Sequence, residues 1–158
     1  MLDHEEFVDR NLIKVRRASA SDAVSISSLY RQLMSNPAVS ISPDHLQTLA
    51  GSESHFVLVA EQDGVVKGTV LLSLCADVMF HKQPFAVVEN IIVDQGARSV
   101  GIGAALMRAV EVHCKAAECS KIMMLSASHR VEAHKFFERQ GYVSSAKVGF
   151  VKYRKAFA

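Results

Sequence analysis

The sequence predicts an α/β (α+β) fold, with a mixed, mainly antiparallel central sheet and helices on both faces. Apolar runs typical of strands are interspersed with segments of helical periodicity, in the order strand, helix, helix, strand, strand, strand, helix, strand, helix, strand, strand. The 158 residues, 49% hydrophobic and 22% charged, suit one domain with its own core. We therefore expect a single domain over 1–158, with its core over 12–154 and a lead-in segment over 1–11.

The first strand is expected over residues 12–17, where β-branched and basic residues alternate as in an edge strand. Ser19 to Asp22 then offers several helix N-caps, and apolar residues recur at helical spacing until Asn36 and Pro37. A short second helix is expected over 43–50, because Ser42 is a good cap and Pro43 suits a first helical turn.

Two buried strands follow over 55–62 and 65–75, and Asp63-Gly64 between them is a strong hairpin signal. The next segment, 77–84, has more apolar character than a connector needs. Two interpretations remain open for it: it covers the core, or it forms part of a substrate wall, since functional residues concentrate on loops.

The centre of the chain is the stretch from Phe85 to Val110, where an apolar run leads through a glycine-bearing turn into an alanine-rich helix. This helix is expected from Gly101 to about Ala117. Gly101 and Gly103 permit backbone conformations and close approaches that other residues resist. The turn therefore suits a bound anion such as a pyrophosphate at the helix N-terminus, with Arg98 as a nearby cation, although a tight turn without ligand has the same pattern.

The rest of the chain is expected to form a strand over 121–126 and a last helix over 132–140 that ends at Gly141. Two extended segments, around 142–146 and 148–154, complete the predicted sheet.

The turn lacks both G-x-G-x-x-G and G-x-x-x-x-G-K-[ST]. Arg98-Ser99-Val100-Gly101-Ile102-Gly103 instead resembles the R-x-x-G-x-G signature of the GCN5-related N-acetyltransferase (GNAT) family, and 89–94 resembles that family's central strand. The resemblance implies that acetyl-CoA is the cosubstrate, with its pyrophosphate in the turn and its pantetheine arm along the strand. The coenzyme-binding residues implied in this way are Ile91, Ile92, Val93, Arg98, Ser99, Val100, Gly101, Ile102, Gly103, Ala104 and Phe137.

A second block, Ala133 to Tyr142, resembles the family's A-x-x-F-Y-E-x-x-G-F pattern. It departs at Phe137, where many relatives have a tyrosine that protonates the departing thiolate. Tyr142 is a candidate for the missing acid, with Tyr153 and Ser128 as alternatives. A coenzyme contact made by asparagine in many relatives is also in doubt, because Arg130 occupies that place.

Glu89 is the predicted general base, because a carboxylate inside an apolar run is costly to bury unless it faces a polar cleft or has a partner. Strand alternation places it on one face with Ile91 and Val93. A structural alternative also stands, in which Glu89 pairs with a buried lysine or arginine or lies at a wet strand end. Three histidines are further candidate bases: His81, His129 and His134.

The resemblance therefore implies an acetyl-CoA-dependent N-acetyltransferase that acts on a primary amine of a small molecule, such as an amino sugar or polyamine, by direct attack in a ternary complex. A faint likeness to glucosamine-phosphate N-acetyltransferases points the same way. The alternatives are a protein or peptide N-acetyltransferase, and a non-catalytic acetyl-CoA sensor or interaction module. A homodimer is expected from the resemblance alone.

Other features exclude several classes of protein. The formal charge of +2 is too small to argue for a nucleic-acid partner. The N-terminus is acidic, unlike a signal peptide, and no apolar run approaches the ~20 residues that span a bilayer. Cys75, Cys114 and Cys119 lack metal-ligand spacing, so we expect no metal and reduced thiols in a cytoplasmic protein.

Overall fold

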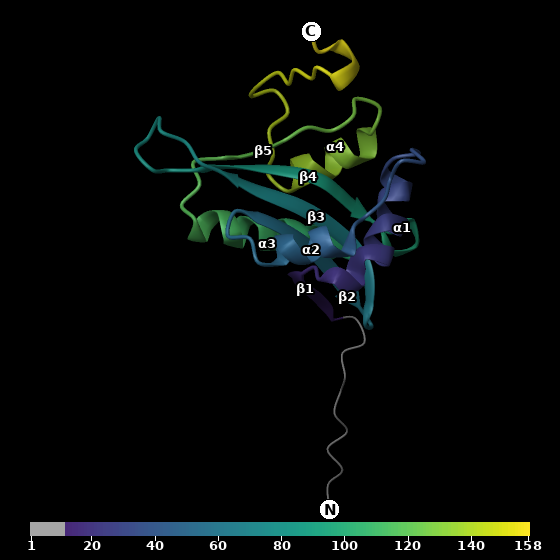
Figure 1. The fold of residues 1–158 in the computed structure, drawn as a ribbon. Coiled ribbons are helices and arrows are strands. Elements are labelled where there is room, and N and C mark those ends of the chain that lie inside the picture. Colours follow the sequence, from purple (N-terminus) through teal and green to yellow (C-terminus); the bar gives the residue numbers. More distant parts are fainter. Residues whose placement is uncertain (1–11) are drawn as a thin grey trace, which may run out of the picture. The chain divides into compact units, whose positions relative to one another are not determined.

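The computed structural model describes residues 12–158, so the expected lead-in segment over 1–11 lies outside the described residues. The chain divides after Met123 into two compact units, which are described separately below. Its strands form one five-stranded sheet in the order β1-β2-β3-β4-β5 (Figure 1). The first unit contains β1 (Ile13–Arg17), α1 (Ala23–Leu33), α2 (Pro43–Ala50), β2 (His55–Gln62), β3 (Val65–Cys75), β4 (Phe85–Val93) and α3 (Ile102–Ala116), and β5 (Ile122–Met124) follows at the boundary.

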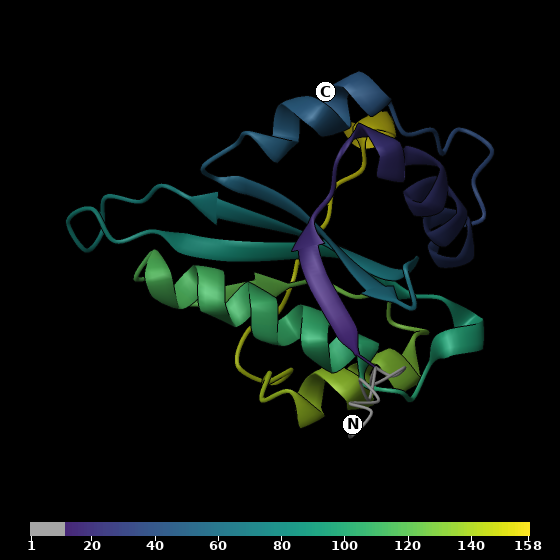
Figure 2. The same ribbon diagram turned by 90° about the horizontal axis from the view of Figure 1, so that it is seen from below.

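The strands β1 to β4 pair antiparallel, each with the next in the chain. Figure 2 shows α1 and α2 on one face of these strands and α3 on the other. Gly68 of β3 lies under α3, where a Cβ would come within 2.9 Å of the Ile102 side chain and 3.1 Å of that of Leu106. The opposite face is filled by a buried cluster from the α1 and α2 side and strand β2: Ala18, Ala23, Ile26, Leu46, Val57 and Val59. The expected fold class, a mixed sheet with helices on both faces, is confirmed.

Local sequence signals fix several elements as predicted. Strands β2 and β3 have the expected bounds, and the two residues between them, Asp63 and Gly64, are both left-handed, with φ of 52° and 74°. This is the geometry of a tight hairpin turn. The hydroxyl of Ser42 accepts a hydrogen bond from the amide of His45 (3.2 Å), which caps α2 at the expected residue.

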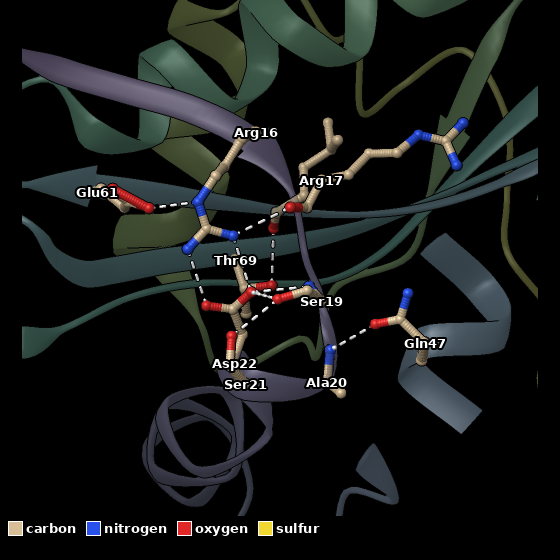
Figure 3. Close-up of polar contacts among 10 residues, drawn as sticks. Arg16, Arg17, Ser19, Ala20, Ser21, Asp22, Gln47, Glu61 and Thr69 are labelled. Atoms are coloured by element: carbon tan, nitrogen blue, oxygen red, sulfur yellow. Dashed lines mark hydrogen bonds and ion pairs between the residues drawn. The ribbon is translucent and has the colours of Figure 1, made fainter. Parts of the chain in front are cut away.

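A partly buried ion pair fastens β1 to the start of α1 (Figure 3). Arg16 donates from Nη1 and Nη2 to the two carboxylate oxygens of Asp22, at 2.8 and 2.9 Å, and its Nε also donates to Glu61 on β2. The amide of Ser19 donates to Asp22 Oδ2 (2.8 Å). Hydrogen bonding from Arg16 holds the pKa of Asp22 below its ordinary value. The carboxylate is therefore charged and satisfied within the protein.

The second unit, residues 124–158, contains α4 (Val131–Arg139), which ends before the left-handed Gly141 (φ 89°) as predicted. The prediction of two further strands over 142–146 and 148–154 is wrong, because residues 142–153 are in turn or irregular conformation and Arg154 begins a short 3-10 helix, η3 (Arg154–Ala156). Their apolar side chains are exposed, as Val148 and Phe150 illustrate. A strand needs a neighbouring strand to accept its backbone hydrogen bonds, and β-propensity alone supplies none.

Candidate active site

Strand β4 leads through a short 3-10 turn, η2 (Gln95–Ala97), into helix α3. The turn is fastened at Asp94, whose amide donates to the Lys67 carbonyl of β3 (2.7 Å) and whose carbonyl accepts from the Ala97 amide (2.9 Å). Beyond this point the backbone is left-handed at Ser99 (φ 68°) and again at Gly101 (φ 94°). Left-handed conformations are costly for residues other than glycine, so the turn holds an unusual shape immediately before the helix.

The first turn of α3 presents backbone donors and carries no acidic residue. Its first α-helical hydrogen bond runs from the Ala105 amide to the Gly101 carbonyl (2.9 Å). The N–H groups of Ile102, Gly103 and Ala104 therefore precede the helical hydrogen-bond ladder and have no intrahelical acceptor. Together with the positive end of the helix dipole, they suit an anionic ligand.

Arg98 and Val100 lie on the exposed side of this turn. The Nε of Arg98 donates to the Val93 carbonyl at 3.3 Å, so the Arg98 side chain folds back onto the end of β4. Arg98 thus adds a positive charge next to the N-terminus of α3, within the segment that the sequence marked as a phosphate site.

A β-bulge interrupts β4 at Glu89 and Asn90. Leu71 of β3 lies opposite Glu89, but Thr69, only two residues away, lies opposite Ile92. The extra residue is accommodated by Asn90, which is left-handed with φ of 54°. Opposite residues in an antiparallel pair share a face, so Glu89 shares its face with Ile92, and Val93 faces the other way. The expectation that Glu89, Ile91 and Val93 share one face is therefore wrong.

Glu89 lies on the sheet face that α1 and α2 cover, because Leu71 opposite it packs against the cluster on that face. Its side chain is nevertheless exposed. Within residues 12–158 its carboxylate has no hydrogen bond or ion pair, so the alternative of a buried lysine or arginine partner is wrong. A carboxylate at a bulge, open to solvent, is able to accept a proton from a ligand that reaches it.

Sequence reasoning missed Asn90, which follows Glu89 at the bulge, and Tyr30, which contacts the Asn90 side chain from α1. Tyr30 is half-buried on α1, and burial raises the pKa of its hydroxyl while a hydrogen bond with the Asn90 side chain opposes that shift. The hydroxyl therefore stays protonated at neutral pH. The sequence contained one signal for the bulge at Asn90. Asparagine tolerates the left-handed conformation that a bulge requires, and it stood inside a predicted strand.

Phe137 and Tyr142 belong to the second unit. The Phe137 ring is buried and packs edge-on against Phe136, with 5.5 Å between ring centroids. The Tyr142 amide donates to the Phe137 carbonyl (3.1 Å), which closes the end of α4. The other two acid candidates, Ser128 and Tyr153, are exposed. Of the alternative bases, His134 contacts the Ala127 carbonyl through Nε2 (3.0 Å), and His81 and His129 are exposed.

The loop over 77–84 does not cover the core, because Val78, Met79 and Phe80 are exposed. Burial raises the pKa of the Cys114 thiol to about 12 and also raises that of Cys119, so neither is a ready nucleophile at neutral pH. Between residues 12 and 158, no three His, Cys, Asp or Glu side chains are grouped as metal ligands would be. No helix in that range has the length and apolarity to cross a membrane.

Comparison with known families decides what this strand, turn and helix belong to. A family model described as the acetyltransferase (GNAT) family matches residues 24–142. The chain belongs to the GNAT acetyltransferase family. Its β4, α3 and the turn between them (residues 94–101, called the coenzyme turn below for the role proposed for it) lie inside the matched range. No curated protein sequence matches the chain.

Solved structures of this family share the fold. A putative acetyltransferase from Agrobacterium tumefaciens is 24% identical, with a TM-score of 0.78 over 89% of this chain and 99% of its own. A glucosamine-6-phosphate N-acetyltransferase from Arabidopsis thaliana is 20% identical (TM-score 0.76; 90% and 99%). An aminoglycoside acetyltransferase from an uncultured soil metagenomic sample is 19% identical (TM-score 0.78; 90% and 96%).

The family's cosubstrate, acetyl-CoA, fits the residues present. The pyrophosphate needs backbone donors and no competing carboxylate, and the first turn of α3 meets both conditions. The left-handed Gly101 is not crowded, since a Cβ there would meet only Ile13 Cδ1 at 3.8 Å. The turn is thus shaped by its backbone and is uncrowded at Gly101.

Proposed function

We propose that this protein transfers the acetyl group of acetyl-CoA to a primary amine of a small molecule, by direct attack in a ternary complex. The observation that carries the proposal is the exposed Glu89 carboxylate, which lies at the bulge of the same strand that leads into the coenzyme turn. A base and an anion-binding turn on one rigid element are what amine acetylation from a phosphorylated coenzyme requires.

Two segments of the first unit are proposed to bind different parts of the coenzyme. We assign the pyrophosphate to the segment from Arg98 to Ala104, and the pantetheine arm to the backbone of Ile91, Ile92 and Val93, by resemblance to the family. When bound, acetyl-CoA supplies an activated acyl group on a thioester.

Glu89 acts on the acceptor. An alkyl amine with a pKa of about 10 is almost wholly protonated at neutral pH, and it attacks only after losing that proton. Glu89 takes the proton, directly or through a water. Asn90, the residue after Glu89, and Tyr30, which contacts Asn90, are the residues we propose for the side from which the amine arrives.

The departing thiol has no tyrosine at position 137 to protonate it. A thiol with a pKa of about 8.5 leaves tolerably as an anion, so the missing acid costs about 10²-fold or less. Tyr142 remains the candidate that supplies this proton.

The acceptor is proposed to be an amino sugar or a polyamine. Two of the similar structures are acetyltransferases of glucosamine-6-phosphate and of aminoglycosides, and a further structure of the latter is a complex with sisomicin. These are amino sugars or carry them, which supports that class first, with a peptide amine as the alternative. We also propose that the protein is cytoplasmic and that it forms a homodimer.

The test is coenzyme thiol release from acetyl-CoA against amino sugars, polyamines, amino acids and peptides, with Glu89→Gln beside the wild type. We expect the variant to lower kcat about 10²-fold or more at neutral pH, with a deficit that shrinks as the pH approaches the amine pKa. Glu111→Gln, an exposed glutamate on α3, is the matched control and should leave turnover unchanged. Equal turnover of Glu89→Gln and wild type at every pH removes Glu89 from the mechanism.

A coenzyme-binding module without turnover is the second candidate, favoured by Phe137 in place of the tyrosine. Calorimetric binding of acetyl-CoA, with no thiol release for any amine of the panel, would favour this module. Thiol release that depends on an added amine establishes the enzyme.

A further inference from the structure

A single glutamine side chain connects α1 to the coenzyme turn. The Nε2 of Gln32 donates to Asp94 Oδ1 at 2.8 Å, and its Oε1 accepts from the Gln95 amide at 2.9 Å. Both ends of one side-chain amide are therefore used on two consecutive residues of the turn. These residues are more than sixty positions away in the chain, so the contact is tertiary and no local signal predicts it.

Asp94 is the residue through which the turn is fixed. Besides Gln32, it contacts β3 twice: its amide donates to the Lys67 carbonyl (2.7 Å), and its Oδ2 lies 3.8 Å from Lys67 Nζ. Its own carbonyl starts the 3-10 turn by accepting from Ala97. The base of the turn is thus held by α1 on one side and β3 on the other, at the start of the segment that leads to the left-handed residues Ser99 and Gly101.

The same helix also contacts the bulge. Tyr30, two residues before Gln32, interacts with Asn90 beside Glu89. The final turns of α1 therefore contact both the carboxylate's neighbour and the base of the coenzyme turn.

We propose that Gln32 is a positioning residue for acetyl-CoA, which sets the place of the pyrophosphate-binding turn without touching the reacting atoms. This inference rests on the proposed function, because it assigns the pyrophosphate to that turn. It predicts that loss of the Gln32 hydrogen bonds weakens binding of the nucleotide half of the coenzyme and spares the pantetheine half.

The test compares Gln32→Met with the wild type, because methionine has a similar length and no amide. We expect Gln32→Met to bind coenzyme A about five- to tenfold more weakly by calorimetry, the loss expected for exposed hydrogen bonds. Binding of S-acetylpantetheine, which lacks the pyrophosphate, should stay within about twofold in an NMR titration. Gln47→Met is the matched control: Gln47 is also an exposed glutamine that accepts a backbone hydrogen bond (from Ala20, 3.1 Å), and its loss should not change coenzyme affinity.

Exchanging the amide and the carboxylate between positions 32 and 94 tests whether their hydrogen bond restores coenzyme A affinity. Gln32→Glu places a second carboxylate against Asp94 and should weaken coenzyme A binding more than Gln32→Met does. Adding Asp94→Asn to Gln32→Glu lets the asparagine amide donate to the new carboxylate, and affinity should return most of the way to that of the wild type.

The outcomes separate this inference from the proposed function. Wild-type affinity in Gln32→Met overturns the inference, and so does an equal loss for coenzyme A and S-acetylpantetheine, because that pattern indicates general damage. A wild-type protein that binds no coenzyme A overturns the proposed function itself. Two results together support Gln32 as the positioning residue. Gln32→Met should lose affinity for coenzyme A but not for S-acetylpantetheine, and adding Asp94→Asn to Gln32→Glu should restore the affinity that Gln32→Glu lost.

Discussion

Two strand-to-helix junctions in the first unit differ in the charged groups that they place at the start of the helix. Between β1 and α1, the Asp22 carboxylate is only 5% exposed and accepts hydrogen bonds from Arg16 and from the Ser19 amide. Between β4 and α3, the first helical turn has no acidic residue, and left-handed Ser99 and Gly101 lie on the exposed surface. At the first junction the carboxylate is used by Arg16 and Ser19 within the protein, whereas the second junction leaves the N-terminus of α3 open to an anion from outside.

The contrast separates structural charge from functional charge. A carboxylate that is buried, paired and hydrogen-bonded contributes stability, and its oxygens are not available to bind a ligand. An unpaired helix N-terminus beside a strained turn contributes little stability and keeps its donors for binding. Substitutions at the first junction should therefore affect folding, and those at the second should affect coenzyme binding.

The largest expected effect is on stability, at Asp22. Asp22→Asn leaves the Arg16 guanidinium without its bidentate partner and should lower the free energy of unfolding by about 2 kcal/mol in urea denaturation. Coenzyme A affinity of the folded protein should not change. Asp44→Asn is the control, because Asp44 is exposed in the first turn of α2 and its loss should cost less than about 1 kcal/mol. A similar loss in both variants would contradict the assigned role of Asp22.

The second prediction concerns acid. Because the folded-state pKa of Asp22 is lowered, its stabilising contribution is present above its ordinary pKa of about 3.9 and is lost as the pH falls through the folded-state value. The difference in unfolding free energy between wild type and Asp22→Asn should be full at neutral pH and shrink below about pH 4. Urea titrations at several pH values measure it, and a constant difference down to the lowest pH would be evidence against this pair.

The smallest expected change in stability tests the second junction. Gly101→Ala should lower the free energy of unfolding by about 1 kcal/mol, the cost of a left-handed non-glycine residue. Gly64→Ala in the β2–β3 hairpin, also left-handed and with nothing within 4 Å of an added Cβ, should cost about the same. Only Gly101→Ala should also weaken coenzyme A binding, by roughly tenfold. Equal coenzyme affinity in the two variants would mean that the turn's shape is not needed for binding.

Local chemistry made much of this protein predictable. Ser42 and Pro43 start α2, Asp63 and Gly64 close the hairpin, and Gly141 ends the last helix, because caps and left-handed turns depend on the residues that form them. The segment from Arg98 to Gly103 also indicated the family from its letters alone. Strand propensity failed over 142–154, where no neighbouring strand supplies the pairing.

The sequence alone determined the order of most elements, the turn before α3 and the identity of the candidate base. Only the tertiary structure decided that Asn90 bulges, that Glu89 faces the α1 side with Ile92, and that Gln32 and Tyr30 approach β4. The register of a strand depends on its partner, and contacts between residues sixty positions apart depend on how the helices pack. Those features therefore arise only once β3, β4 and α1 have come together.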